Sequence, residues 1–346
     1  MPGLKRVSPL FIRTVAYLMV LCLIAGVFTW FAPQFMTAGN LATILRHLAA
    51  DGFAALGLTF VIVVARYEVS FPGVVCFVAM AMGFLISGGL SLPLAFIGGV
   101  LICAGVGAIN GIAVSYLKLN DMVSTIAVGS LAGGGAFLFN GGQSFFKNFV
   151  SCGLLRLNDA KFAGINISVY LLIGVYFVAW LILHRSRFGR VFYATGENPT
   201  SATYSGINVR AVTFWAYLIC SVLMALVALM LMAETGMANV HIGSGCMMAA
   251  YTGVFLGAAL FGGAGVPATF AGTLLIAVIL NGFNLLSVPY YWSDAVLGVV
   301  LVLGIVAFHK DGVNRLKNVF KAKKKAQDRA VEISDSDNNL RLERVK

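Results

Sequence analysis

The sequence predicts an all-α polytopic membrane protein with about ten transmembrane helices and both termini in the cytoplasm. Apolar residues make up 60% of the 346 residues and charged residues only 11%, whereas a soluble domain carries about 25% charged residues. The apolar residues also fall in long runs separated by polar intervals, and a soluble chain of this composition lacks the polar residues to cover its core. These observations exclude a soluble enzyme.

The first elements follow from charge and run length. Residues 1–13 are basic, so we expect them in the cytoplasm. The apolar run Thr14–Phe31 is long enough to span, and too long for a cleaved signal peptide. Asn40 is then expected to cap a short helix, Leu41–His47, at the outer surface. The run Gly52–Ala65 that follows is short for a span, which needs about 20 residues.

An unusual polar stretch, Arg66–Gly73, separates two apolar runs. It combines a cation, an anion, a hydroxyl, a proline and a glycine, as in a broken helix whose freed backbone groups face a cavity. The alternative is an ordinary cytoplasmic turn in which Arg66 and Glu68 balance each other's charge. Because ionisable groups within a membrane are costly, Glu68 is a candidate functional residue.

Eight further apolar runs bring the predicted spans to ten. They are Val74–Ser87, Pro93–Tyr116, Met122–Phe139, Ile167–Leu183, Ala211–Met232, Met247–Phe261, Pro267–Leu286 and Tyr290–Phe308. The main polar breaks are expected at 140–166, 185–210 and 234–246. Within the fourth span, Gly107 and Gly111 stand four residues apart, a spacing that permits close helix contact. Asn110 is the polar residue of that span, and it either bonds a neighbouring helix or lines a path.

Charge sets the predicted orientation. With the N-terminus inside, ten crossings place the interval Arg185–Arg210 and the C-terminal tail on the cytoplasmic side, where positive charge gathers. From His309 onward the tail carries eleven Lys or Arg against six acids, a net charge of 11 − 6 = +5. Such a segment next to an apolar helix is typical of contact with anionic lipid rather than nucleic acid. The expected organisation is an N-terminus at 1–13, a membrane portion at 14–308 with a cytoplasmic loop at 184–210, and a tail at 309–346.

Motifs for catalysis, metals and nucleotides are absent from the sequence. The six cysteines lie mostly inside apolar runs, and the four histidines are far apart, so neither a metal site nor a disulfide framework is indicated. The glycines between Gly105 and Gly111 lie in an apolar run rather than at a strand-to-helix turn, which argues against a dinucleotide site. Because no Walker A pattern occurs, ATP-driven transport requires another chain to hydrolyse the ATP. We expect no enzymatic activity and no cofactor.

The interval Phe188–Val209 resembles the cytoplasmic coupling loop of ribose-type permeases of ABC transporters. It contains Phe-Gly-Arg, then Ala-Thr-Gly-Glu-Asn, then Ser-Gly-Ile, at spacings similar to those in that family. Further short motifs similar to those of the family follow in order at 40–46, 55–57, 108–111, 262–263 and 281–286. Where the family usually has Gly-Gly-Ile-Asp-Leu-Ser-Val-Gly, this chain has the bulkier and more charged Ala65–Gly73, in which an acid and a serine remain.

The resemblance implies a permease subunit of an ABC importer in the bacterial inner membrane, carrying a monosaccharide or sugar-like solute. Its implied partners are two cytoplasmic ATP-binding subunits, an extracytoplasmic solute-binding protein, a second permease subunit and membrane lipid. A short helix at Pro199–Tyr204, between Gly196 and Gly206, is expected to seat in a groove of the ATPase. The residues implied for ATPase coupling are Gly189, Arg190, Gly196, Asn198, Ser205, Gly206 and Ile207. Those expected along the translocation path are Tyr67, Glu68, Ser70, Asn110, Asn281 and Asn284.

Two other functions remain open at the level of sequence. A stand-alone proton-coupled secondary carrier of a small polar solute is conceivable through Glu68, although such carriers usually bury several ionisable groups. A structural membrane anchor for an ATPase complex is the third hypothesis. It predicts that Glu68→Gln and Ser70→Ala leave transport intact.

Overall fold

Helices dominate the computed structural model, which describes residues 9–289 and 291–308. The first half contains α1 (Pro9–Phe31), η1 (Pro33–Met36), α2 (Ala38–Val63), α3 (Phe71–Ser87), α4 (Leu92–Ser115), α5 (Asp121–Ala136) and η2 (Phe137–Phe139). The second half contains α6 (Leu154–Asp159), β1 (Lys161–Phe162), β2 (Ile165–Asn166), α7 (Ile167–Trp180), η3 (Leu181–Arg185), α8 (Arg187–Glu197), α9 (Pro199–Tyr204), α10 (Val209–Thr235), α11 (Cys246–Phe261), α12 (Val266–Leu285) and α13 (Tyr291–Phe308). The two strands pair in an antiparallel hairpin. The predicted tail at 309–346 lies outside the described residues.

The helices confirm a polytopic membrane protein of the all-α class. Among the described residues, seven helical stretches are long and apolar enough to cross a bilayer: α1, α2, α4, α5 with η2, α7 with η3, α10 and α12. Helices α3 and α11 are apolar but shorter, and α13 has 18 residues. A bilayer core needs about 20 helical residues, so these three are near or below the spanning length when taken alone.

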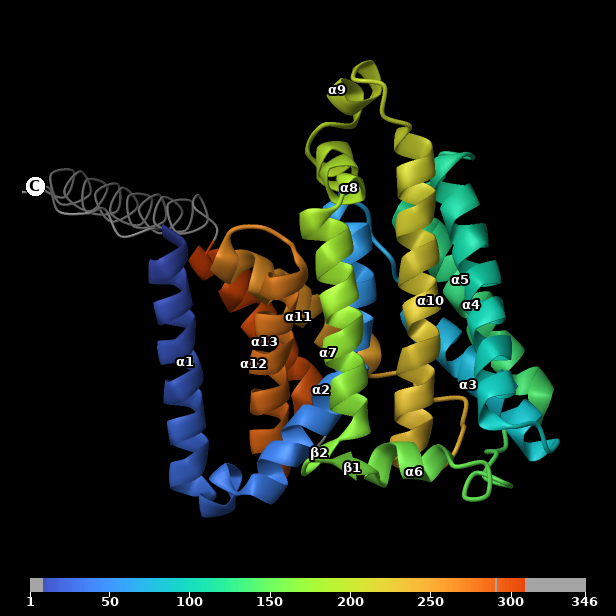
Figure 1. Cartoon of the computed structure of the whole chain (residues 1–346), viewed down its shortest axis with the longest axis vertical. Coiled ribbons are helices and arrows are strands. Elements are labelled where there is room, and N and C mark those ends of the chain that lie inside the picture. Colours follow the sequence, from blue (N-terminus) through green and yellow to red (C-terminus); the bar gives the residue numbers. More distant parts are fainter. Residues whose placement is uncertain (1–8, 290, 309–346) are drawn as a thin grey trace, which may run out of the picture.

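Helices α2, α10 and α12 form the centre of the bundle. In their most apolar stretches 78%, 72% and 72% of the residues are buried, against 11% in α1 and 22% in α4 and α5. The outer helices therefore present their apolar side chains to the surroundings, which for a membrane protein means lipid or another membrane chain. Figure 1 shows α8 and α9 together at one end of the bundle, and α6 with the β1–β2 hairpin at the opposite end.

Glycines bring several backbones into direct contact. A Cβ at Gly107 or Gly111 of α4 would press on the backbone of α10 at Leu218 and Phe214, so the predicted close helix contact is confirmed. The start of α3 makes a similar close backbone contact, because a Cβ at Gly73 would overlap the backbone of α5. In a membrane, such close approach gains packing that bulky side chains prevent.

Residues 38–63 form one continuous helix, so the prediction of a separate short helix at Leu41–His47 was wrong. The N-cap is Thr37, whose side chain accepts the N–H of Asn40, rather than Asn40 itself. The polar residue His47 in this stretch is half-buried, and its Nδ1 lies 2.8 Å from Glu234 Oε1 of α10. Because this polar group finds a partner on a distant helix, α2 runs on without interruption.

The polar intervals contain more structure than the sequence predicts. The expected helix at Pro199–Tyr204 is confirmed as α9, but α8 before it was not foreseen. The interval 140–166 holds α6 and the β1–β2 hairpin. Glu234 belongs to α10, which ends at Thr235, rather than to the predicted break. These elements lack long apolar runs, so hydropathy alone does not reveal them.

Candidate functional site

The stretch between α2 and α3 is a non-helical segment that carries the buried polar side chains Glu68 and Ser70 into the bundle. We call residues 64–70 the connecting segment. Glu68 and Ser70 are only 1% and 2% exposed, and the Glu68 carboxylate is bonded by Ser70 and Asn110 rather than paired with Arg66. The expected charge balance between Arg66 and Glu68 was therefore wrong, whereas the side of the membrane on which the segment lies stays a prediction.

The connecting segment leaves α2 through a left-handed residue. Ala65 has a φ of 55°, and its N–H donates to the Ile62 carbonyl while the N–H of Arg66 donates to the Val61 carbonyl. This pair of bonds is the Schellman arrangement that closes helix C-termini, usually with glycine at the left-handed position. Alanine there costs about 1–2 kcal/mol.

Glu68, Ser70 and Asn110 form one hydrogen-bonded cluster. The Ser70 N–H donates to Glu68 Oε1 over 2.8 Å, and Asn110 Nδ2 donates to Glu68 Oε2 over 3.1 Å and to Ser70 Oγ over 3.2 Å. Because α3 begins at Phe71, the carboxylate lies beside the positive end of that helix, which favours negative charge. Asn110 Oδ1 is buried and has no hydrogen-bond partner among the described residues.

Side chains from three further helices hold the backbone of the connecting segment. Backbone groups outside a helix need such partners wherever water is excluded. The Tyr217 hydroxyl of α10 donates to the Tyr67 carbonyl over 2.8 Å, and the Tyr251 hydroxyl of α11 donates to the Glu68 carbonyl over 2.8 Å. From α5, Thr125 Oγ1 accepts the Val69 N–H over 3.2 Å and Asp121 Oδ2 accepts the Tyr67 N–H over 3.0 Å. The segment is thus fixed from several directions at once.

The other predicted path residues lie elsewhere or face outward. Tyr67 is 39% exposed. Asn281 of α12 exchanges two amide hydrogen bonds with Asn40, of 2.9 and 3.0 Å. Asn40 lies near the start of α2, about 35 Å along the helix axis from its end, so Asn281 does not join the Glu68 cluster. Asn284 is exposed one turn further along α12.

Helix α8 packs one face against the bundle. Residues at spacings of three and four, Gly189, Phe192, Tyr193 and Gly196, are buried or half-buried on that face, as expected for an amphipathic helix. The Tyr193 hydroxyl donates to the Ala264 carbonyl over 3.1 Å, which links α8 to the loop between α11 and α12. Burial raises the pKa of Tyr193 above its ordinary value, so the hydroxyl stays protonated as a donor.

Helix α9 projects from the end of the bundle. Its N-cap is Asn198, whose side chain accepts the Ser201 N–H over 3.0 Å, and Gly206 follows its end with a φ of 81°. Ala202 is buried, whereas Tyr204 is 89% exposed. Small polar side chains and an exposed tyrosine on a capped helix suit contact with a partner in water.

The residues implied for coupling divide between two faces. Gly189 and Gly196 face the bundle, because a Cβ at either would overlap the carbonyl of Leu183 or Val63. The exposed residues are Arg190, Asn198, Ser205 and Gly206, and Ile207 is half-buried. Gly189 and Gly196 therefore serve packing within the chain, and the exposed residues are available to a partner.

Sequence reasoning missed the two tyrosines of the site. Tyr217 and Tyr251 lie inside apolar runs, where an aromatic residue is expected to be an ordinary core residue. The only available signal was that a buried tyrosine hydroxyl needs a partner. The contact between the His47 and Glu234 side chains was missed for a similar reason, since 187 residues of sequence separate the two partners.

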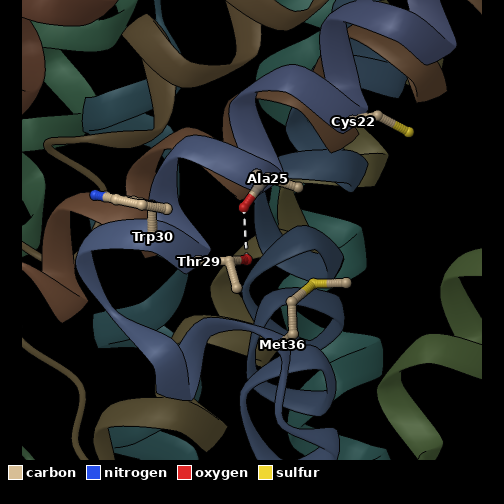
Figure 2. Close-up of a pocket in the computed structure, with 6 residues that line it drawn as sticks. Cys22, Ala25, Thr29, Trp30 and Met36 are labelled. Atoms are coloured by element: carbon tan, nitrogen blue, oxygen red, sulfur yellow. Dashed lines mark hydrogen bonds between the residues drawn. The ribbon is translucent and has the colours of Figure 1, made fainter.

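The described residues offer no metal site, and a groove along α1 is open rather than enclosed. In the part of the chain that the structure describes, no three His, Cys, Asp or Glu side chains gather to hold a metal ion. The groove, of about 630 Å³, runs along α1 and η1 and is lined by Cys22, Ala25, Gly26, Thr29, Trp30 and Met36. Figure 2 labels five of these residues. The Thr29 hydroxyl there is bonded to the Ala25 carbonyl over 2.7 Å, so the groove offers mainly apolar surface to lipid.

The chain matches one known family over most of its length. The profile of the family described as "Branched-chain amino acid transport system / permease component" matches residues 40–305. That range includes both the connecting segment and helices α8 and α9.

Curated relatives align over a similar span. The ribose import permease protein of Escherichia coli strain K12 is 26% identical, covering 85% of this chain and 92% of that protein. The ribose import permease protein of Bacillus subtilis strain 168 is 28% identical over 80% of this chain and 87% of its own length. The autoinducer 2 import system permease protein of Escherichia coli strain SMS-3-5 is 29% identical, with shares of 79% and 85%. No solved structure matches the chain.

Proposed function

The chain belongs to the family of branched-chain amino acid transport system permease components, and from this premise we propose that it is the membrane-spanning permease subunit of an ABC importer. It carries no ATP-binding motif of its own. The energy for transport therefore comes from a separate ATP-binding subunit. The match over residues 40–305 is the observation that carries this proposal.

The proposed solute is a monosaccharide or a sugar-like compound. The family description names branched-chain amino acids, but the relatives aligned over four fifths of this chain import ribose or autoinducer 2. The cluster of Glu68 and Asn110 also suits hydroxyl groups, because it pairs hydrogen-bond acceptors with an amide donor. An aliphatic amino-acid side chain gains nothing from such a cluster.

The proposed topology has ten crossings with both termini in the cytoplasm. The seven long apolar stretches account for seven crossings, and α3, α11 and α13 supply three more. The domains are then an N-terminus at 1–13, a permease domain at 14–308 and a basic tail at 309–346. In this arrangement the 184–210 loop, with α8 and α9, lies on the cytoplasmic side of the bacterial inner membrane. The arginines of the loop then agree with the positive-inside rule.

The proposed path for the solute passes the connecting segment. Glu68, Ser70 and Asn110 supply weak polar contacts that replace part of the hydration of a sugar without trapping it, and Tyr67, Asn281 and Asn284 line the path at other depths. Support comes from Asn110 Oδ1, a buried acceptor without a hydrogen-bond partner among the described residues. High affinity belongs to a separate solute-binding protein.

The proposed coupling surface is the outer face of α8 and α9. Two cytoplasmic ATP-binding subunits dock there, one on this chain and one on a second permease subunit, with Arg190, Asn198 and Ser205 toward the partner and Gly189, Gly196, Gly206 and Ile207 shaping the loop. Closure of the ATPase then moves the helices as rigid bodies. The exposed Tyr204 at the end of α9 is the side chain placed to enter a groove.

A vesicle assay tests this function. Proteoliposomes with this chain, its ATP-binding and solute-binding partners, and trapped ATP should accumulate radiolabelled sugars from a panel of pentoses and hexoses, and exclude labelled leucine. Uptake by this chain alone under a proton gradient would contradict the proposal and favour a secondary carrier. Accumulation of leucine in place of sugars would agree with the proposed importer function but would contradict the proposal that the solute is a sugar.

A further inference from the structure

Helix α8 touches the last turn of α2 through bare backbone. Gly196 lies so close to α2 that a Cβ there would overlap the Val63 carbonyl and press on Val64. No side chain separates the two backbones at this point. A displacement of α8 is therefore passed to the end of α2 without a flexible side chain to absorb it.

A second contact on the same face of α8 fixes the direction of that transfer. Phe192 packs edge-to-face on Phe60, with ring centroids 6.0 Å apart and an interplanar angle of 80°. Both rings are buried, at 5% and 1% exposure. Phe192 and Gly196 are one helical turn apart, as are Phe60 and Val64. One turn of α8, from Phe192 to Gly196, thus lies against the last turn of α2.

The connecting segment begins where these contacts end. Val64 is 3% exposed, and Ala65 and Arg66 are bonded back to α2, so no slack loop precedes Glu68. Only three residues separate Val64 from the Glu68 carboxylate, which is bonded to Asn110 of α4. A movement of the end of α2 therefore alters the Glu68–Asn110 bond before it alters more distant helices.

We propose that Gly196 and Phe192 form a mechanical joint with Val63 and Phe60 through which α8 moves the connecting segment. Gly196 is thereby a positioning residue that acts on Glu68 from the coupling loop, rather than a residue that touches the ATPase. In the described arrangement, Glu68 and Asn110 bond each other. Displacement of the segment separates them and frees an amide donor and a carboxylate acceptor for solute hydroxyls. This inference rests on the proposed coupling function of the 184–210 loop.

Amide hydrogen exchange on the full-length chain in lipid nanodiscs tests the joint. In Gly196→Ala the added methyl forces α8 off α2, and the peptide covering residues 64–70 should exchange about tenfold faster than in the wild type. Gly263→Ala is the matched control, because nothing lies within 4 Å of the added methyl and the backbone there is not left-handed. Its exchange in residues 64–70 should equal that of the wild type.

A second variant covers the case in which Gly196→Ala does not fold. Phe60→Leu loosens the same joint without adding volume, and it should also speed exchange in residues 64–70. Phe146→Leu, at a ring that is 73% exposed, serves as its control. Unchanged exchange in residues 64–70 in the folded joint variants overturns the proposal.

A transport readout separates the joint from the proposed function. In the assembled transporter, Gly196→Ala should keep ATP hydrolysis while sugar uptake per ATP falls about tenfold. If wild-type uptake depends on ATP but the variant transports normally, the joint is refuted and the importer function stands. If the wild type shows no ATP-dependent uptake while exchange in residues 64–70 still rises in the variant, the function fails and the joint stands.

Discussion

The connecting segment and helix α9 are two polar interruptions of an apolar chain, and they use their polar groups in opposite ways. In α9 the polar bonds are local: Asn198 bonds Ser201 and Ser205 bonds Ser201, three or four residues away. In the connecting segment the bonds reach across the fold, from Glu68 to Asn110 and to Tyr251, 42 and 183 residues away.

This difference indicates what each region can do. The polar groups of helix α9 form hydrogen bonds within the helix and its surface is exposed, so a partner can bind α9 without breaking hydrogen bonds of the bundle. The polar groups of the connecting segment keep their hydrogen bonds only while helices α4, α5, α10 and α11 keep their places. These bonds therefore depend on the packing of the whole bundle. The two regions are linked through α8, which precedes α9 and touches the end of α2 at Val63, directly before the connecting segment.

The largest effect is expected at Glu68. Glu68→Ala removes the acceptor of the Ser70 N–H and of Asn110 Nδ2, and each buried donor left unpaired costs about 1–3 kcal/mol. We expect a lower thermal unfolding midpoint of the chain in nanodiscs and loss of sugar uptake. Glu68→Gln, which keeps one acceptor oxygen, should be intermediate. Normal uptake by both variants would support the structural-anchor hypothesis instead.

The next largest effect is expected at α9, where stability and function should separate. The double change Gly206→Pro with Asn198→Ala places a proline, whose φ is near −65°, at a position with φ 81°, and removes a cap worth about 1 kcal/mol. The chain should still insert, because the bundle does not depend on α9. Stimulation of ATPase activity by the loaded binding protein should be abolished. Thr200→Ala, on the exposed surface of α9, is the control and tests whether any change there suffices.

A smaller effect is expected from the two tyrosines. Tyr217→Phe removes one hydroxyl bond to the connecting segment. Tyr251→Phe removes two, because the Tyr251 hydroxyl donates to the Glu68 carbonyl and accepts the Glu68 N–H over 3.1 Å. Each bond is worth about 0.5–1.5 kcal/mol. The two changes should be non-additive in thermal unfolding because they hold neighbouring carbonyls of one segment. Strict additivity, measured in a double-mutant cycle, would show that the segment is not one cooperative unit.

The smallest effect is a gain in stability at Ala65. Ala65→Gly relieves a left-handed alanine and should stabilise the fold by up to about 1 kcal/mol, after the extra entropy of glycine in the unfolded chain is deducted. A modest rise of the thermal midpoint is the expected result. No rise, or a fall, would mean that the methyl group makes contacts that outweigh the strain.

Much of the fold was predictable because lipid demands long apolar helices. Thr14–Phe31 and Ala211–Met232 were expected as spans, and α1 and α10 contain them. The short helix α9 was predictable from the resemblance alone. Helix α8 was not, since glycines at 189 and 196 look like breaks until their close approach to Leu183 and Val63 is known.

The candidate site was predictable only in outline. Glu68 and Ser70 were singled out because polar residues between apolar runs need an explanation, and Asn110 because it is polar within a span. Their mutual bonding depends on α4 packing beside the start of α3, which no local pattern encodes. The helix break predicted before Gly52 failed for the same reason, because the partner of His47 is Glu234 on α10.

The most direct test of the account is amide exchange in residues 64–70 within the assembled transporter, measured with and without a non-hydrolysable ATP analogue. Docking at α9 and the joint between Gly196 and Val63 predict that the nucleotide changes exchange in that segment, although the sequence of this chain contains no Walker A pattern. Altered exchange confined to α8 and α9, with residues 64–70 unchanged, would contradict the link between the two regions.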